Sequence, residues 1–187
     1  MKSYNYGVDY SIKLRKVERS DMDILSEFKC ERPAIRKFIQ RGCLTSRENV
    51  SYIFIDEEHN TIIGFCSIRC SGIATIRYDE EDNEYETSLP SIEITYFAID
   101  ERYRSLRFDE ECNRYQTLSQ MLFLQMLDII SEISTNNVGA THICLYAVPE
   151  AENFYKRCEF QPFKRYMKRD EKPYIKDCIP MFTVLKN

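Results

Sequence analysis

The stretch that decides the fold is Ala151–Phe160, which reads AENFYKRCEF. It follows Pro149, and proline is favoured in the first turn of a helix. Ala151, Phe154 and Tyr155 stand three and four positions apart, so a helix places them on one face. A short apolar, β-branched run, Thr141–Ala147, comes directly before it and predicts a buried strand. The C-terminal part of the chain therefore contains a strand followed at once by a helix.

A longer helix is predicted upstream, over Thr117–Ser134. It is apolar on nearly all sides except the line of Gln125, Asp128 and Glu132, which indicates a largely buried helix. Another β-branched and aromatic run, Ser91–Ile99 (SIEITYFAI), precedes it. A helix between two strands can serve as the crossover that parallel strands require.

The remaining elements follow from the same periodicities. They comprise strands at Ser11–Val17, Ser51–Asp56, Thr61–Gly72, Phe163–Met167 and Ile179–Leu185, a helix capped by Ser20-Asp21 and running to Lys29, a helix at Ala34–Gln40, and a solvated acidic loop at Asp79–Glu86. The turn-like EEHN joins the second and third of these strands as a hairpin. We therefore expect an α/β fold: a mixed, mostly antiparallel central sheet with helices on both faces, forming a single domain over residues 1–187.

Composition narrows the function classes. The chain has 187 residues, a net charge of -4 and eight cysteines without a CxxC pair. The negative balance argues against general nucleic-acid binding. His59 and His142 lie far from any cysteine pair, so we expect no metal site. Cys66 and Cys70 share one face of a predicted strand and are expected to pack there. Neither a spanning apolar segment nor a signal peptide is recognisable, which predicts a cytoplasmic protein with reduced cysteines.

Four segments in order resemble the GNAT superfamily of N-acetyltransferases. They are TIIGFCSI at Thr61–Ile68, IEITYFAIDERYR at Ile92–Arg104, AENFYKRCEF itself, and IPMFTVLK at Ile179–Lys186. The resemblance covers most of the chain. It implies the GNAT fold and the transfer of an acetyl group from acetyl-CoA to an amine acceptor.

The phosphate loop departs from that family. The family pattern Gln/Arg-x-x-Gly-x-Gly/Ala has no glycine counterpart, and RYQTLS stands in its place after an apparent insertion at Ser105–Asn113. The resemblance implies acetyl-CoA contacts at Arg114, Gln116, Thr117, Leu118 and Ser119, and backbone pairing with the pantetheine arm at Phe97, Ala98 and Ile99. Thr117 and Ser119 are also ordinary helix-start residues that need no ligand.

Two residues are candidates for proton transfer. Glu93 lies in an otherwise apolar strand, where burial would raise the pKa of a carboxyl group and suit it to act as a base. Alternatively, Glu93 faces solvent or pairs with a nearby arginine. Tyr155 matches the family tyrosine that protonates the departing CoA thiolate. Alternatively, it is a core aromatic residue. Glu159 replaces the family's glycine before Phe160.

Three functions remain open. The first is acetylation of the amino group of a small molecule, peptide, protein or aminoacyl-tRNA. The second follows from FKCERPAIRKFI at Phe28–Ile39, which resembles the toxin-like GNAT subgroup and implies tRNA as the substrate and an antitoxin partner. The third is a non-enzymatic binding module with a degenerate CoA loop. Membrane association is not expected, and homo-oligomerisation is left open.

Overall fold

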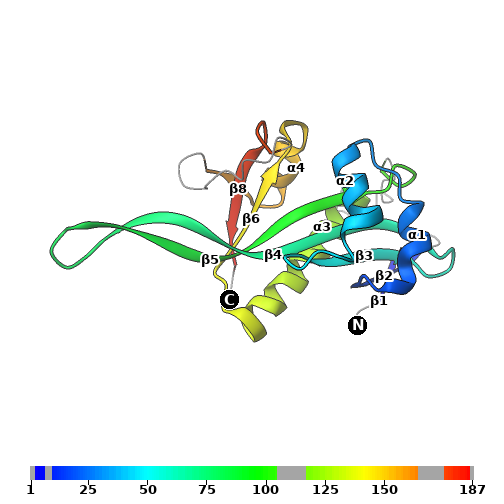
Figure 1. Cartoon of the computed structure of the whole chain (residues 1–187), viewed down its shortest axis with the longest axis horizontal. Helices are drawn as coiled ribbons and strands as arrows, with labels where there is room; N and C mark the ends of the chain where they lie inside the picture. The colour runs from blue at the N-terminus through cyan, green and yellow to red at the C-terminus, as the bar shows by residue number, and fades with distance from the viewer. Residues whose placement is uncertain (1–2, 7–9, 105–116, 164–174, 186–187) are drawn as a thin grey trace. The chain divides into compact units, whose positions relative to one another are not determined.

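The computed structural model describes residues 3–6, 10–104, 117–163 and 175–185 (Figure 1). Its strands are β1 (Ser3–Tyr6), β2 (Tyr10–Lys16), β3 (Val50–Asp56), β4 (Thr61–Tyr78), β5 (Glu84–Ile99), β6 (His142–Ala147), β7 (Gln161–Pro162) and β8 (Ile179–Val184). Its α-helices are α1 (Met22–Ser26), α2 (Pro33–Lys37), α3 (Leu118–Ile133) and α4 (Glu152–Arg157), and short 3₁₀ or π turns flank them.

One sheet of eight strands runs in the order β1-β2-β3-β4-β5-β6-β8-β7. The pair β5–β6 is parallel, whereas β1–β2, β2–β3, β3–β4, β6–β8 and β7–β8 are antiparallel. α3 joins the two parallel strands along the chain, as the crossover prediction requires. The predicted mixed, mostly antiparallel sheet is confirmed.

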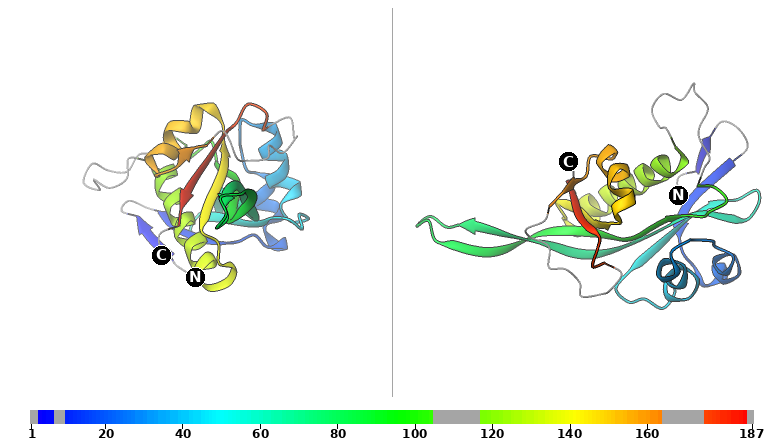
Figure 2. Two further views of the ribbon diagram at one scale, coloured as in Figure 1. Left: turned by 90° about the vertical axis from the view of Figure 1, so that its left-hand side faces the viewer. Right: turned by 90° about the horizontal axis from the view of Figure 1, so that it is seen from above.

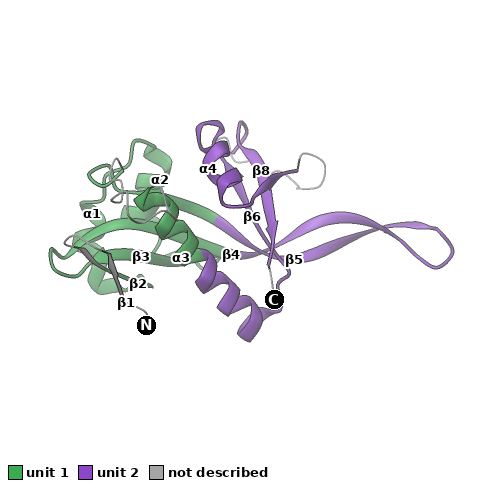
Figure 3. Cartoon of the chain, turned by 180° about the vertical axis from the view of Figure 1, so that it is seen from behind, with its two compact units in different colours: residues 1–68, 95–126 green, residues 69–94, 127–187 purple. Residues whose placement is uncertain are grey.

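The chain divides into two compact units (Figure 3). Unit 1 comprises residues 1–68 and 95–126, and unit 2 comprises residues 69–94 and 127–187. β4, β5 and α3 each contribute residues to both units. The single domain expected over residues 1–187 stays a prediction.

In unit 1, helices lie on both faces of the sheet, with α1 and α2 on one face and the first part of α3 on the other (Figure 2). Residues along a strand point alternately to the two faces. Ile53 and Phe65 therefore join the buried cluster that contains Phe28 beside α1 and Ile39 after α2. Gly64 faces the other way, where an added Cβ would lie 3.3 Å from Leu122 of α3.

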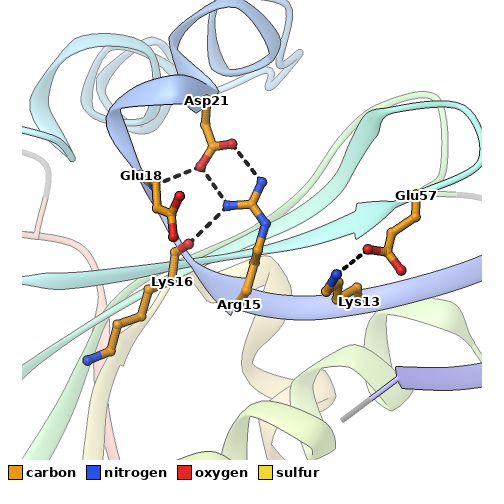
Figure 4. A network of polar contacts seen from close by, with 6 residues as sticks. All are labelled: Lys13, Arg15, Lys16, Glu18, Asp21 and Glu57. Carbon is orange, nitrogen blue, oxygen red and sulfur yellow. Dashed lines mark hydrogen bonds and ion pairs between the residues drawn. The ribbon is translucent and has the colours of Figure 1, made fainter. Parts of the chain in front are cut away.

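An ion pair anchors the start of α1 to β2 (Figure 4). The Arg15 guanidinium donates to both carboxylate oxygens of Asp21 at 2.7 and 2.6 Å, and the Glu18 N–H donates to Asp21 at 2.7 Å. α1 ends at Ser26, so the prediction that it runs to about Lys29 made the helix too long. The Lys29 N–H donates to the carboxylate of Asp100 at 2.8 Å instead of continuing the helix.

In unit 2, the parallel ladder between β5 and β6 runs from Ser91↔His142 to Ile94↔Leu145. Strand β8 pairs with the other edge of β6, from His142↔Val184 to Ala147↔Ile179. One face of these strands is aliphatic and buried, and its members are Ile92, Ile94, Ile143, Leu145 and Met181.

The hairpin of β4 and β5 is longer than predicted. β4 continues past Gly72 to Tyr78, and β5 already begins at Glu84 within the segment predicted as a loop. Only the turn between them is a loop. There the carboxylate of Asp79 accepts the N–H groups of Glu81 and Asn83, each at 2.9 Å.

Three smaller differences concern the first strand, the strand expected after α4, and one cysteine. β1 was not predicted. A short strand, β7, lies at Gln161–Pro162, and the strand expected at Phe163–Met167 falls, apart from Phe163, within residues 164–174, which lie outside the described part. Cys66 is fully buried, as expected, but Cys70 is exposed.

Among the described residues, no helix is long and apolar enough to cross a membrane.

Candidate active site

The turn that ends α4 fixes the backbone around Tyr155. The Phe160 N–H donates to the Tyr155 carbonyl at 3.1 Å, and the Glu159 N–H donates to the Lys156 carbonyl at 3.1 Å. Glu159 adopts a φ of 67°. This pair of hydrogen bonds with a left-handed residue between them is the Schellman motif, which normally carries glycine at the left-handed position. Glu159, which stands where the resembled family motif has glycine, therefore itself adopts the left-handed conformation.

The Tyr155 side chain lies among aromatic rings. Its ring centroid is 5.1 Å from that of Phe154 at an interplanar angle of 81°, and 6.1 Å from that of Phe160. Phe160 is fully buried, whereas Tyr155 and Phe154 are half-buried. The contact between Tyr155 and Phe160 is the apolar contact that accompanies a Schellman motif. Tyr155 is therefore anchored at its ring and backbone and remains partly accessible to a ligand.

Glu93 is buried in β5 with 4% of its surface exposed, which excludes the alternative that it faces solvent. The sequence suggested apolar surroundings for this carboxylate, but the structure places a charged partner beside it. Arg69 of β4 donates to its two carboxylate oxygens from Nε at 3.1 Å and from Nη2 at 3.0 Å. This two-bond geometry is the strong form of an arginine–carboxylate pair and stabilises the charged carboxylate. The alternative of a nearby arginine partner is the arrangement observed.

Cys144 stands opposite Glu93 in the parallel ladder. Burial raises the pKa of its thiol to about 12, and the negative charge of Glu93 adds to this effect. The thiol therefore stays protonated near neutral pH and is not a nucleophile there.

The first turn of α3 contains the described part of the expected phosphate loop. Thr117 precedes the helix, and its Oγ1 accepts the Gln120 N–H at 3.2 Å. This is the hydrogen bond of a helix N-cap. It agrees with the alternative that Thr117 is an ordinary helix-start residue, which needs no ligand. The N–H groups of Leu118 and Ser119 belong to the first helical turn, where no intrahelical carbonyl can accept them. These two groups fit the donors that a phosphate needs at a helix N-terminus. Arg114 and Gln116 lie outside the described residues.

The end of β5 contains the three residues expected beside the pantetheine arm. The Phe97 ring contacts the Phe123 ring of α3 at 5.0 Å. Ala98 points to the opposite face, into the cluster with Phe28 and Ile39. Both side chains are thus committed to packing, which leaves the backbone of Phe97–Ile99 as the part suited to bind a ligand. The described ladder with β6 ends at Ile94 and does not include these residues.

The residue just after β5 holds this strand end in place. Asp100 is fully buried, and its carboxylate accepts the Lys29 N–H at 2.8 Å and Arg102 Nε at 2.8 Å. Burial disfavours its ionisation, but the hydrogen bonds from Arg102 and from the Lys29 N–H outweigh this and hold the pKa of Asp100 below its usual value.

The sequence did not identify Arg69 or Asp100 as site residues. Arg69 lies 24 positions from Glu93, and the two meet only because β4 and β5 are neighbouring strands. One signal was available: a glutamate inside an apolar strand needs a cationic partner. It does not indicate which cation. Asp100 follows an apolar strand directly, which is an ordinary position for a turn residue.

No protein-family profile matches the chain, and no curated protein matches it in sequence. Solved structures do match it in fold. A structure solved as a bacterial toxin superimposes with a TM-score of 0.68 at 16% identity, over 95% of this chain and 92% of the other.

Two further matches were solved with ligands. A Tyr-to-Phe mutant of the toxin AtaT, bound to acetyl-CoA and to the C-terminus of the antitoxin AtaR, has a TM-score of 0.61 at 15% identity and covers 93% of each chain. AtaT complexed with acetyl-methionyl-tRNAfMet has a TM-score of 0.61 at 16% identity, over 91% of this chain and 94% of the other. The chain therefore has the GNAT-like fold of these toxins, at identities that establish the fold alone.

Proposed function

We propose that this chain transfers the acetyl group of acetyl-CoA to the amino group of an aminoacyl-tRNA. The observation that carries the proposal is the fold match over more than nine-tenths of the chain to toxins solved with acetyl-CoA and with acetyl-methionyl-tRNA. The sequence leaves several acceptors open. Among them, this match favours an aminoacyl-tRNA, which is the substrate implied by the resemblance to the toxin-like subgroup. A charged tRNA carries the free amine that the reaction needs.

The donor site is proposed at the start of α3 and the end of β5. The N–H groups of Leu118 and Ser119 point out of the first helical turn, where a diphosphate is stabilised by free donors and by the helix dipole. Thr117 adds a hydroxyl that can donate while its oxygen caps the helix. Arg114, Gln116 and the backbone of Phe97–Ile99 complete the proposed donor site.

Tyr155 is the proposed acid. Acetyl-CoA supplies an activated carbonyl carbon, to which the acceptor nitrogen forms a bond while the carbon–sulfur bond breaks. The tyrosine hydroxyl then gives its proton to the leaving sulfur, and the second proton that the acylated nitrogen loses restores the phenol. A phenol suits this step because its ordinary pKa of about 10 keeps the proton in place at neutral pH. The aromatic contacts with Phe154 and Phe160 orient the ring.

Glu93 is the proposed base, and it acts while its carboxylate is paired with Arg69. Arg69 donates one hydrogen bond to each of its carboxylate oxygens, and every such oxygen has a second lone pair. Glu93 can therefore accept the proton of the acceptor ammonium while it remains paired. The guanidinium of Arg69 offsets the buried negative charge of the carboxylate.

A toxin of this kind needs a partner that restrains it. AtaT was solved with the antitoxin AtaR and, in a separate complex with AtaR, on DNA. We extend this to the present chain as a proposed antitoxin partner. The competing non-enzymatic module shares the fold, and its distinguishing feature is a loop that cannot bind acetyl-CoA.

The test compares Tyr155→Phe with Tyr78→Phe, which removes the same hydroxyl from an exposed hairpin residue. Tyr155→Phe should lower the rate of labelled acetyl transfer to aminoacyl-tRNA by about 100-fold or more, because general acid catalysis typically contributes that much. It should still gain thermal stability from acetyl-CoA, since it loses only one hydroxyl. Tyr78→Phe should match the wild type in both measurements.

Two results would count against the proposal. If saturating acetyl-CoA leaves the melting temperature of the wild type unchanged and no acetyl group is transferred, the chain is a binding module. If Tyr155→Phe transfers acetyl groups at the wild-type rate, another group is the acid. Glu93→Gln in the same assay tests the base: a kcat lower by about 100-fold or more is expected, and an unchanged kcat rejects this role.

A further inference from the structure

A cavity opens in unit 1 beside α1 and α2. It has a volume of about 610 Å³ and is lined by Ser26, Glu27, Phe28, Lys29, Arg36, Gln40 and Arg102. None of these residues belongs to the proposed donor site or to the catalytic pair. Its volume falls in the range of roughly 300–1,000 Å³ that bound small molecules occupy, so it can hold a nucleotide.

Hydrogen bonds fix the walls of this cavity. The Asp100 carboxylate accepts the Lys29 N–H at 2.8 Å, and it accepts Arg102 Nε at 2.8 Å and Nη2 at 3.0 Å. Elsewhere in the lining, Gln40 Nε2 donates to the carbonyls of Ser26 at 2.9 Å and Phe28 at 3.2 Å. A ligand would therefore meet a wall that is already ordered, which lowers the entropic cost of binding.

The lining is positively charged. Lys29, Arg36 and Arg102 are cationic and Glu27 is anionic, so the lining carries +2 (three minus one), whereas the whole chain carries -4. Asp100 behind Arg102 lowers the total by one more charge but occupies only two of the guanidinium nitrogens. Within the described part of the chain, the side chains of Lys29 and Arg36 make no hydrogen bond or ion pair, and both are exposed. Two free cations beside an oriented arginine suit an anion with several oxygens.

We propose that this cavity binds backbone phosphates of the RNA acceptor near its aminoacylated end. The inference rests on the proposed function, because it takes RNA as the acceptor. Lys29 and Arg36 neutralise the phosphates, and Arg102 presents its remaining N–H groups to an oxygen. Such contacts fix the position of the substrate and carry no base specificity.

The test measures the binding of a fluorescent, uncharged acceptor-stem RNA by anisotropy at several salt concentrations. The double variant Lys29→Ala/Arg36→Ala is compared with Lys37→Ala/Arg41→Ala, which removes the same charges from exposed neighbours outside the cavity. The first double variant should bind roughly tenfold more weakly, with a salt slope lower by about 1.4, since each phosphate contact in a single strand contributes about 0.7. The second should stay within about twofold of the wild type.

Three outcomes overturn the inference: the wild type does not bind the RNA, both double variants lose affinity equally, or the cavity variant loses affinity for acetyl-CoA and not for RNA. The last outcome would assign the cavity to the phosphate of CoA. RNA without an attached amino acid lacks the acceptor amine, so the measured RNA affinity does not depend on acetyl transfer. A wild type that binds RNA through the cavity but transfers no acetyl group rejects the proposed function and leaves the phosphate site intact. Circular dichroism and melting temperatures verify that all variants fold.

Discussion

Glu159 occupies a left-handed backbone conformation, with a φ of 67°, at the end of α4. Such a conformation brings the Cβ of an L-residue close to a neighbouring carbonyl oxygen and costs about 1–2 kcal/mol, whereas glycine adopts it freely. The surrounding Schellman hydrogen bonds force the conformation on whichever residue stands there. Glu159 thus stores strain in the turn between Tyr155 and the buried Phe160.

We therefore predict that Glu159→Gly raises the free energy of unfolding by about 1 kcal/mol, or the melting temperature by roughly 2–4 °C, since it relieves the left-handed strain. Asn153→Gly in the same helix is the control and should lower the free energy of unfolding by only a few tenths of a kcal/mol, because glycine has a slightly lower helix propensity than asparagine. Thermal denaturation monitored by circular dichroism compares them. A destabilised Glu159→Gly would mean that other contacts of the Glu159 side chain outweigh the strain.

Asp21 makes the stability depend on pH. Burial disfavours its ionisation, but hydrogen bonds from Arg15 and from the Glu18 N–H are stronger together and lower the pKa of the carboxyl group. A pKa that is lower in the folded state contributes stability above the unfolded value of about 3.9. This contribution is lost as the pH falls through the folded value.

Accordingly, Asp21→Asn should lower the free energy of unfolding by about 1–3 kcal/mol at pH 7, because it leaves Arg15 without its carboxylate. The difference from the wild type should shrink as the pH falls below about 4. Urea denaturation between pH 7 and pH 3 measures it, with Asp23→Asn as the control at an exposed carboxylate of the same helix. A difference that stays constant down to pH 3 would show that charge is not the cause.

At the scale of elements, the distal part of the β4–β5 hairpin is a two-stranded ribbon. Its large apolar side chains are exposed at Ile76, Tyr78 and Tyr85, at 36%, 64% and 46%. Gly72 fits closely against Ser88, since a Cβ added to it would lie 2.1 Å from the Ser88 hydroxyl. A ribbon without a third strand or a covering layer is marginally stable in water.

We predict that amides between Gly72 and Thr87 exchange with deuterium at least tenfold faster than those of Ile62–Cys66 in the same strand, because few buried contacts oppose local opening of the ribbon. Hydrogen exchange followed by mass spectrometry on the isolated chain resolves the two segments as separate peptides. Equal protection of both would indicate that another copy or another molecule covers the ribbon.

For the whole molecule, the two units share three continuous elements. β4, β5 and α3 each run from one unit into the other. Unfolding either unit alone would therefore break the hydrogen bonds of elements that belong to both. This continuity favours the single domain that the sequence predicts over residues 1–187.

We expect one calorimetric transition, with equal calorimetric and van't Hoff enthalpies, because shared elements couple the unfolding of the two units. The enthalpy should be about 130 kcal/mol near 60 °C, from about 0.7 kcal/mol for each of the 187 residues. Differential scanning calorimetry measures both quantities. Two resolved transitions, or a van't Hoff enthalpy near half the calorimetric one, would show two independent folding units.

Local signals determined most of the order of elements. Proline before α4, the apolar surface of α3 and the β-branched runs of β3 and β6 are each encoded within a short window, which is why their positions agree with the structure. The ends of elements were less predictable. Gly72 was the predicted end of a strand that continues to Tyr78 in the structure. Its tight fit against Ser88 depends on the partner strand.

The candidate site divides in the same way. By itself, the sequence singled out Glu93, because a charge in an apolar strand is visible in a single window, and it indicated Tyr155 only through the resemblance of AENFYKRCEF to a family motif. Only the tertiary structure decided that Arg69 pairs with Glu93, that Asp100 ties the end of β5 to Lys29, and that three cations line one cavity. The physical reason is that strand pairing and helix packing bring together residues distant in the chain, and no local periodicity records which of them meet.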